Sequence, residues 1–236
     1  MNALLLSVAV LVSHSAFAQP EMTRVEIVHI SKDLRVADFH QKAWRQARPI
    51  HVTKYWSGDA APMERTFEVR LLWSADTLFV RFYAEQHEPI VIRDHPDTSK
   101  KVRGLWDYDV CEIFIAPDRT SAYKYLEFEV APTGEWIDLG IEVTPKERLT
   151  DWEYTSGMEA AADIEHGKVI EIIKVPFKAF GRTPKPGDIW LGNIFRCIGK
   201  DPSRGYLAWR PTRTEKPAFH VPEAFGEFQF VGGANR

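Results

Sequence analysis

The 236-residue chain contains only two cysteines, Cys111 and Cys197, and only four methionines. At most one disulfide can form within the chain, and burial of two free thiols is an equally open outcome. Paired Cys-x-x-Cys and His-Glu-x-x-His sequences are absent, so the usual sequence signs of a zinc site are missing. Met63 and Met158, together with His220, are the candidate axial ligands of a haem, and no recognised pairing supports them.

Neither sign of charge dominates, since 30 basic residues stand against 33 acidic ones and the formal net charge is −3. The chain therefore lacks the basic footprint that nucleic acids and anionic membranes attract. A glycine-rich phosphate loop and a Gly-x-Ser-x-Gly nucleophile elbow are also absent. We expect no nucleic-acid partner.

Long apolar runs are missing as well. The run at residues 4–12 is too short to span a bilayer as a helix. It precedes Ala16-Phe17-Ala18, a small-x-small cleavage site, so residues 1–18 are predicted to be a signal peptide and the mature chain to begin at Gln19. We expect a secreted or periplasmic protein that has no contact with a membrane once the signal is removed.

The mature chain shows no long amphipathic helix and instead alternates between apolar and polar residues. About ten strands are predicted, with turn signals between them, and residues 152–154 begin one of them. Residues 38–47 and 176–180 are predicted to form short helical turns, the first with Trp44 buried as a core anchor. The pattern is typical of an all-β, antiparallel β-sandwich forming one domain over residues 19–236, and a β-barrel is the alternative architecture.

The most informative stretch is residues 104–117, which contains Trp106 and a predicted strand with Glu112 in its middle. Alternation places Val110, Glu112 and Phe114 on one side of this strand. Because a carboxylate is costly to bury without a partner, Glu112 is predicted to point into a groove near Trp106. An indole stacks on the C–H face of a sugar while a carboxylate accepts its hydroxyl hydrogen bonds, and eight tryptophans favour a recognition role. The alternative is a core tryptophan with Glu112 paired to an arginine.

Carboxylates elsewhere leave two further interpretations open. Glu112 with Glu127 or Glu129 on a neighbouring strand is the candidate acid pair of a glycosidase. Sandwich domains can hold structural calcium through carboxylates, and Asp107, Asp109 and Asp118 are the candidate ligands. Their spacing matches no known calcium motif.

Several segments, in their order and spacing, resemble carbohydrate-binding modules of family 9 and the wider superfamily of DOMON-like β-sandwiches. One is Trp106-x-x-Asp109-x-x-Glu112-Ile113-Phe114-Ile115, which is similar to the family's signature strand. The resemblance spans nearly all of the mature chain, and its segments lie at residues 38–47, 71–80, 106–115, 125–134, 187–196 and 219–226.

The resemblance implies a binding site in which two aromatic rings sandwich a terminal sugar. The first ring falls on Trp106, the signature glutamate on Glu112 and the second ring on Phe219. A hydroxyl-binding arginine of the family falls near Glu129, where this chain departs from the pattern, and Arg196 on the neighbouring strand is the candidate replacement. Lys216 occupies a position that is polar in the family.

The expected function is exported, non-catalytic binding of mono-, oligo- or polysaccharides in carbohydrate catabolism. No cofactor is expected, and a structural calcium ion is an open possibility. The alternatives are a DOMON-like haem or redox domain, a polysaccharide-active glycoside hydrolase, and an interaction domain that has lost the sugar site.

Overall fold

The structure, a computed structural model, describes residues 23–233, so the predicted signal peptide lies outside the described part of the chain. The described residues form 13 strands joined by turns, with no long helix. The strands are β1 (Arg24–His29), β2 (Ile50–Val52), β3 (Phe67–Trp73), β4 (Thr77–Glu85), β5 (Val110–Ala116), β6 (Lys124–Val130), β7 (Trp136–Val143), β8 (Arg148–Asp151), β9 (Glu159–Glu165), β10 (Lys168–Pro176), β11 (Ile189–Ile198), β12 (Gly205–Ala208) and β13 (Gly226–Val231). The short 3-10 turns are η1 (Lys42–Gln46), η2 (Met63–Arg65), η3 (Leu105–Asp107), η4 (Phe177–Phe180) and η5 (Pro222–Ala224).

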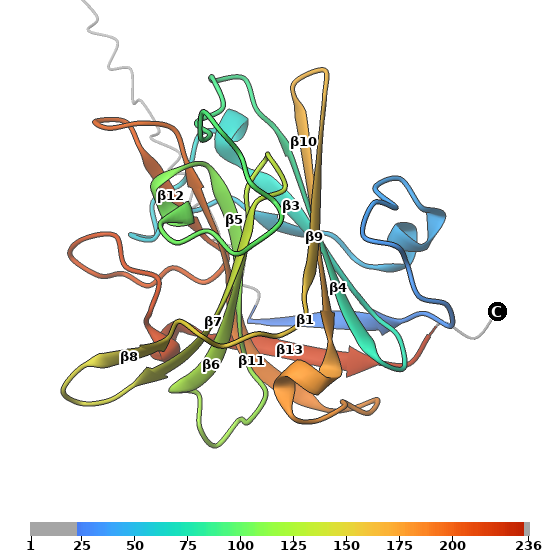
Figure 1. Ribbon diagram of the computed structural model, residues 1–236. Coiled ribbons are helices and arrows are strands. Elements are labelled where there is room, and N and C mark those ends of the chain that lie inside the picture. Colours follow the sequence, from blue (N-terminus) through green and yellow to red (C-terminus); the bar gives the residue numbers. More distant parts are fainter. Residues whose placement is uncertain (1–22, 234–236) are drawn as a thin grey trace, which may run out of the picture.

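The strands follow one continuous path that curls into two packed layers (Figure 1). The order is β8-β7-β6-β5-β11-β13-β1-β3-β4-β10-β9, with β12 beside β11 and β2 beside β3. Pairing is antiparallel except where β1 runs parallel to both β13 and β3. The predicted antiparallel sandwich is therefore confirmed, with more strands than the sequence indicated.

The main apolar core lies between the two layers. Ile113 and Ile194 of one layer and Val80 and Ile173 of the other belong to the same buried cluster. Trp44 anchors a smaller cluster on the far side of the second layer, as predicted, and is only 4% exposed. A third cluster, containing Phe114, lies on the outer face of the first layer, beneath loops. This covered outer face is where the candidate site lies.

Alternation along β5 and β11 separates the two cysteines. Cys111 faces the core between the layers, whereas Cys197 belongs to the outer cluster. Cys197 pairs in register with Val110, the neighbour of Cys111, so the two thiols leave opposite faces of the sheet. Both are free and buried, which decides between the two outcomes that the sequence left open.

Several polar side chains are enclosed between the layers. Arg196, 2% exposed, donates from Nη2 to Gln86 Oε1 at 2.6 Å and from Nη1 to the Arg65 carbonyl at 3.2 Å. Glu171 of β10 faces the same interior, beside Cys111. Burial is the main cause that raises the pKa of Glu171 to about 7.

The weakest part of the sequence prediction was residues 152–154, predicted to begin a strand. They form a turn instead, and the strands β8 and β9 lie on either side of it. β8 is mostly exposed, and β9 contains no fully buried residue, so both strands lack the apolar alternation from which the other strands were predicted. Within residues 23–233, no helix has the length and apolar character that crossing a membrane requires.

Glu171 gives a testable dependence of stability on pH. Its pKa is about 7 when folded and near the ordinary 4.5 when unfolded. The folded state therefore holds the proton more tightly, and the contribution of Glu171 to stability is complete below pH 4.5 and lost as the pH rises through 7. Between pH 5 and pH 8, the unfolding free energy of the native chain should fall by up to about 3 kcal/mol more than that of Glu171→Gln, because only the native chain carries the titrating carboxyl group.

Urea unfolding at the two pH values measures this difference. Glu26→Gln, at an exposed position on β1, is the matched control and should follow the native chain. An equal loss in Glu171→Gln and the native chain would show that Glu171 is not titrating in the folded protein.

Candidate functional site

Three glutamates lie together on the outer face of β5 and β6. Glu112 and Glu129 are direct cross-strand partners, and Glu127 lies two residues from Glu129 on the same face. One carboxylate oxygen from each lies within 4.8 Å of the others. All three are at most 3% exposed. Alternation does place Glu112 on the face away from the core between the layers, but the prediction that it points into an open groove is wrong, because its side chain is enclosed among other acidic groups.

Burial raises the pKa of all three glutamates, because a charge is poorly solvated there. For Glu112 the neighbouring Glu127 raises the pKa further, and for Glu129 both other carboxylates do. Arg204 lowers the pKa of Glu112 and Arg148 that of Glu127, each by less than burial raises it. In the absence of another cation, the group therefore retains protons above the ordinary range of a glutamate.

A thiol and an imidazole border the three glutamates. Cys197 Sγ donates to Glu112 Oε1 at 3.7 Å, and burial raises the pKa of this thiol well above its usual value. His220 Nδ1 lies 3.9 Å from Glu127 Oε2 and 2.8 Å from the Tyr125 hydroxyl. Burial lowers the pKa of His220 to about 3, so the ring is neutral at physiological pH.

Trp106 stands on η3 at the edge of this face, and 36% of it is exposed. Its ring centroid lies 6.1 Å from that of Trp152, with the rings tilted by 45°. The Arg103 guanidinium lies 4.9 Å from the Trp152 ring centroid and pairs with Glu153 at 3.2 Å. Trp106 and Trp152 thus form an aromatic rim with charged groups beside it.

Arg204 fixes the turn that carries Trp106. Its Nη2 donates to the carbonyls of Trp106 and Tyr108, each at 2.7 Å, and its Nη1 donates to the Gly199 carbonyl at 2.6 Å. Asp109 ties the same loops, because its Oδ1 accepts from the Gly199 amide at 2.7 Å. The Trp106 ring is therefore positioned by bonds to its backbone, which leave its own faces available.

Phe219 does lie over the predicted face, although it is not an open ring. It stacks on Phe195 with centroids 4.1 Å apart and planes 11° apart, and it is 9% exposed. Phe195 is the cross-strand partner of Glu112, so Phe219 is near the glutamates as predicted. The structure places it as a packed lid of the outer cluster, with one face covered by Phe195.

The remaining predicted site residues are Arg196 and Lys216. Arg196 faces the core between the layers, opposite to Glu112, so the expectation that it joins the same site is corrected: alternation along β11 turns its side chain inward. Lys216 is exposed in the loop before Phe219, and its carbonyl accepts from Thr214. Glu129, by contrast, lies at the centre of the site.

The three aspartates considered for calcium are dispersed. Asp107 and Asp118 are exposed, and Asp118 accepts from the Thr120 amide and hydroxyl. Asp109 is buried and accepts from Gln86 Nε2 and two backbone amides. In residues 23–233 three candidate ligand atoms converge at two other places, the three glutamates and the group of His40, Asp163 and Glu165.

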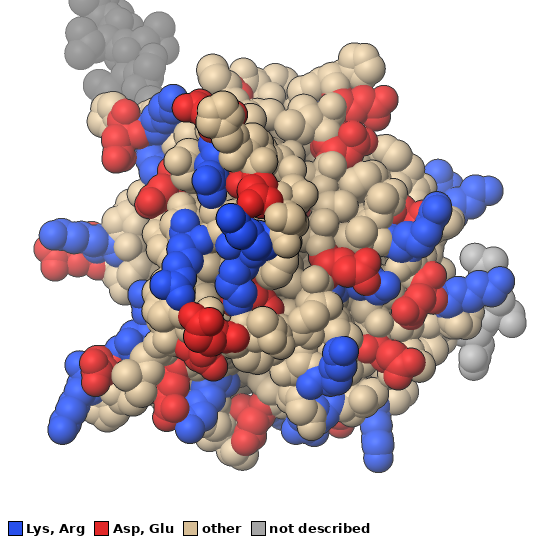
Figure 2. Space-filling model, viewed as in Figure 1, with Lys and Arg blue, Asp and Glu red and all other residues tan. Residues whose placement is uncertain are grey.

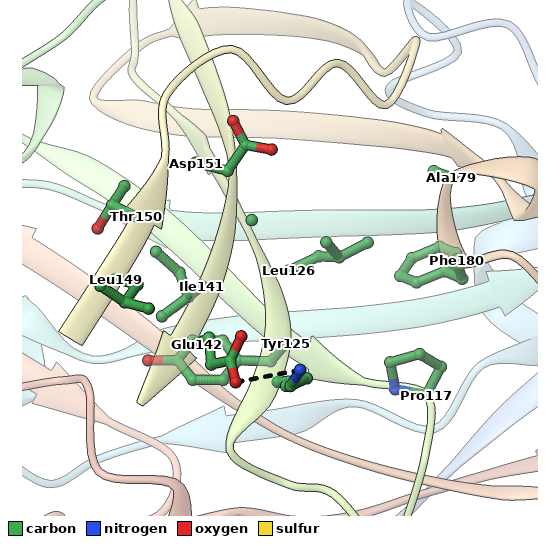
Figure 3. Close-up of a pocket in the computed structure, with 12 residues that line it drawn as sticks. Pro117, Tyr125, Leu126, Ile141, Glu142, Leu149, Thr150, Asp151, Ala179 and Phe180 are labelled. Carbon is green, nitrogen blue, oxygen red and sulfur yellow. Dashed lines mark ion pairs between the residues drawn. The ribbon is translucent and has the colours of Figure 1, made fainter. Parts of the chain in front are cut away.

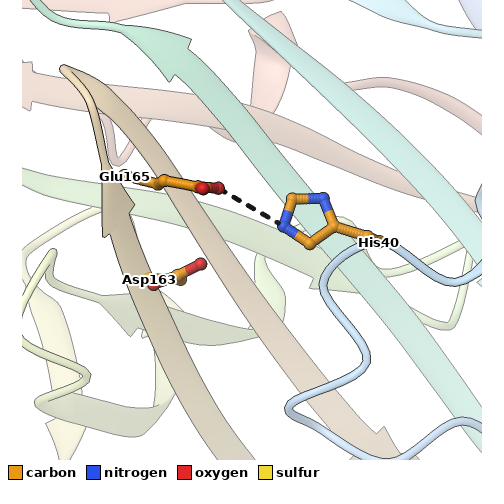
Figure 4. A group of neighbouring side chains, drawn as sticks. All are labelled: His40, Asp163 and Glu165. Atoms are coloured by element: carbon orange, nitrogen blue, oxygen red, sulfur yellow. Dashed lines mark ion pairs between the residues drawn. The ribbon is translucent and has the colours of Figure 1, made fainter.

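The second group lies on the surface between the η1 segment and β9 (Figure 4). His40 Nε2 lies 3.9 Å from Glu165 Oε2, and the two side chains are 65% and 55% exposed. Water reaches these groups, and the ion pair accounts for their proximity.

The residues considered for haem ligation do not converge. Met63 is on the surface, Met158 is part of the core between the layers, and His220 is on the outer face. A sheet therefore separates Met158 from His220, and this arrangement does not fit a haem held by that pair.

A hollow of about 490 Å³ lies beside the ends of β6 and β7 (Figure 3). Tyr125, Ile141, Leu149 and Phe180 supply apolar walls, and the Lys124–Glu142 ion pair of 3.0 Å borders it. Trp106, Glu112 and Phe219 lie outside its lining. Basic and acidic side chains are interspersed over the molecular face shown in Figure 2. That face therefore carries no large patch of one charge that would attract a ligand of the opposite charge.

Trp152 is one of the site residues that the sequence prediction missed, along with Glu153 and Arg204. It was assigned to an extended run, whereas it occupies a turn between β8 and β9. Its neighbours in the sequence could have indicated a surface position, because a tryptophan between Asp151 and Glu153 in a polar segment is poorly suited to a core.

Comparison with solved structures shows the same fold. A protein from Bacteroides uniformis ATCC 8492 aligns with a TM-score of 0.66 at 14% identity, over 88% of this chain and 99% of that chain. A family 9 carbohydrate-binding module from Caldicellulosiruptor kristjanssonii, solved in complex with glucose and also with cellotriose, aligns with a TM-score of 0.63 at 13% identity, over 90% of this chain. The alignments cover 98% and 95% of the module in the two complexes.

Comparison of sequences finds the human UPF0462 protein C4orf33, which is 25% identical over 173 residues, or 61% of this chain and 81% of the human protein. The sequence model of carbohydrate-binding family 9 matches residues 42–230. That range runs from η1 into the last strand and includes the three glutamates and the aromatic rim. The chain therefore belongs to carbohydrate-binding family 9.

Proposed function

We propose that the protein binds a saccharide at the aromatic rim formed by Trp106 and Trp152. The observation that carries the proposal is the exposure of Trp106, 36%, on a turn held through its backbone carbonyls. A large indole left in water beside a second one is typical of a binding surface. Its flat face suits the C–H face of a pyranose ring, and stacking on it is worth about 0.5–1.5 kcal/mol beyond burial, by analogy with aromatic pairs.

Charged groups beside the rim supply the hydrogen bonds that a sugar requires. Arg103 offers guanidinium donors and Glu153 offers carboxylate acceptors, and their side chains are 60% and 91% exposed. Glu112, predicted to contact the sugar, is enclosed at 2% exposure. A sugar stacked on the rim therefore meets Arg103 and Glu153 first, while the glutamates lie beneath the outer face.

The comparisons support a saccharide as the ligand. The family is defined by carbohydrate binding, and the module of the same fold from Caldicellulosiruptor kristjanssonii was solved with glucose and with cellotriose. A terminal sugar of a glucan is the natural first ligand to test. With one stacking surface and a few charged hydrogen bonds, the affinity should lie in the micromolar to millimolar range, on the order of −4 to −8 kcal/mol.

The proposed role is non-catalytic capture of saccharides outside the cytoplasm, in the breakdown of polysaccharides. The signal-like residues 1–18 support export. Catalysis by the glutamates is less well supported, because a glycosidase must hold its two carboxyl groups against a bound substrate. Here the three glutamates are at most 3% exposed, so a sugar does not reach them in this structure.

Removing the exposed ring should weaken binding without unfolding the protein. Trp106→Ala should lower the affinity for cello-oligosaccharides by about tenfold or more. Trp152→Ala should lower it by roughly threefold to tenfold, since that ring is less exposed. Titration calorimetry measures both, and Tyr123→Ala, which removes another exposed aromatic ring, is the matched control. Unchanged affinity in both tryptophan variants would reject the rim as the site.

Phe219 should behave differently. Because it is 9% exposed and stacked on Phe195, Phe219→Ala should lower the free energy of unfolding by about 3 kcal/mol or more. Trp106→Ala should change it by less than about 1 kcal/mol. Urea unfolding of the two variants makes the comparison. If Phe219→Ala leaves stability intact and abolishes sugar binding, the second ring of the site is Phe219 and not Trp152.

A further inference from the structure

We propose that Glu112, Glu127 and Glu129 form a binding site for one divalent cation of the oxygen-preferring class, such as Ca²⁺ or Mn²⁺. The three side chains come from adjacent strands, and one oxygen from each lies within 4.8 Å of the others. Oxygens that ligate one Ca²⁺ ion at about 2.3–2.6 Å lie no more than about 5 Å apart, and the three carboxylates meet this requirement.

A second observation, beside the closeness of the three carboxylates, points to a ligand: their buried oxygens lack hydrogen-bond donors. Glu129 is 0% exposed, and within residues 23–233 no N–H, hydroxyl or thiol group donates to either of its oxygens. Glu127 Oε2 likewise receives no such donor, so the one hydrogen bond open to these oxygens is between Glu127 and Glu129 themselves and requires a shared proton. Nearly all buried polar atoms in proteins are hydrogen-bonded, so several such oxygens in one place are exceptional. A cation would satisfy all of them at once.

The groups that border the cluster favour an oxygen-preferring ion over zinc or copper. Cys197 is the sulfur that borders the cluster, and its thiol donates to Glu112 Oε1 at 3.7 Å, so it is placed as a hydrogen-bond donor to a carboxylate. His220 Nδ1 already contacts the Tyr125 hydroxyl at 2.8 Å. The ligand set that remains is three carboxylates, which hard cations prefer.

The strand scaffold suits a fixed coordination site. Glu112 and Glu129 are held opposite each other by the β5–β6 pairing, and every residue of β5 is buried. Ligands on paired strands lose little freedom when an ion binds. The surface group of His40, Asp163 and Glu165 lacks this order, since it combines a loop residue with a strand at the edge of the sheet.

The ion site and the proposed sugar site are made of different residues. The rim is made of Trp106 and Trp152, whose exposed rings lie outside the carboxylate cluster. Loss of the ion should therefore leave stacking on the rim possible, and loss of the rim should leave the ion in place. Each property can be measured on the same variants.

The test is a titration of the full mature chain, treated with chelator and then dialysed, with MnCl₂ while free Mn²⁺ is followed by electron paramagnetic resonance. We expect one bound Mn²⁺ per chain, displaced by CaCl₂. Glu129→Gln, which keeps the shape and removes the charge, should weaken Mn²⁺ binding by at least about tenfold, as lost ligand interactions do. Glu165→Gln, in the surface group, is the matched control and should bind as the native chain does.

Two results would overturn the proposal. One is no bound Mn²⁺ at millimolar concentration, in which case the three glutamates share protons and no ion. The other is loss of binding in Glu165→Gln with retention in Glu129→Gln, which would place the ion at the surface group. Circular dichroism and thermal melting check that Glu129→Gln folds, and Glu127→Gln replaces it if it does not. Cello-oligosaccharide titration of the same variants shows whether sugar binding persists without the ion.

Discussion

Alternation along β5, a strand buried on both faces, is the constraint on which the rest of the site depends. Its odd-numbered residues, Cys111 and Ile113, fill the core between the layers. Glu112 must then leave on the other side, where β6 sets Glu129 directly opposite it. Loops cover that side, so the carboxylates are enclosed instead of solvated. The fold thus concentrates acidic groups of raised pKa beneath a surface that presents aromatic rings to water.

Much of the fold could be predicted because many of its strands show apolar and polar residues that alternate along the sequence. Strands β3, β4, β5 and β11 carry dense apolar residues at period two, and the burial of Trp44 followed from its helical spacing. Alternation also placed Glu112 away from the core between the layers. Strands β8 and β9 were beyond this reasoning, because neither has a fully buried face that would require alternation. Their place in the sheet is set by the partners β7 and β10.

The candidate site was less predictable, because it depends on which distant segments cover one face. Spacing brought Phe219 near Glu112 but could not show that Phe195 would occupy one of its faces. Arg196 was assigned to the site although its parity on β11 matches Ile194 and Ile198, both of which are core residues. The pairing of β11 with β5 sets Phe195 opposite Glu112, so Arg196, the next residue along β11, must point to the other face of the sheet. Trp152 was not predictable in this way, because its approach to Trp106 depends on the path of a turn.

Arg204 physically connects the exposed rim to the enclosed glutamates. Its guanidinium binds the carbonyls of Trp106 and Tyr108, and the same charge lowers the pKa of Glu112. A cation among the glutamates would repel Arg204, whereas ionised glutamates without a cation would attract it. The occupancy of the cluster therefore acts on the group that holds the Trp106 turn. Because those hydrogen bonds go to backbone carbonyls, any influence reaches the position of the indole and leaves its stacking chemistry unchanged.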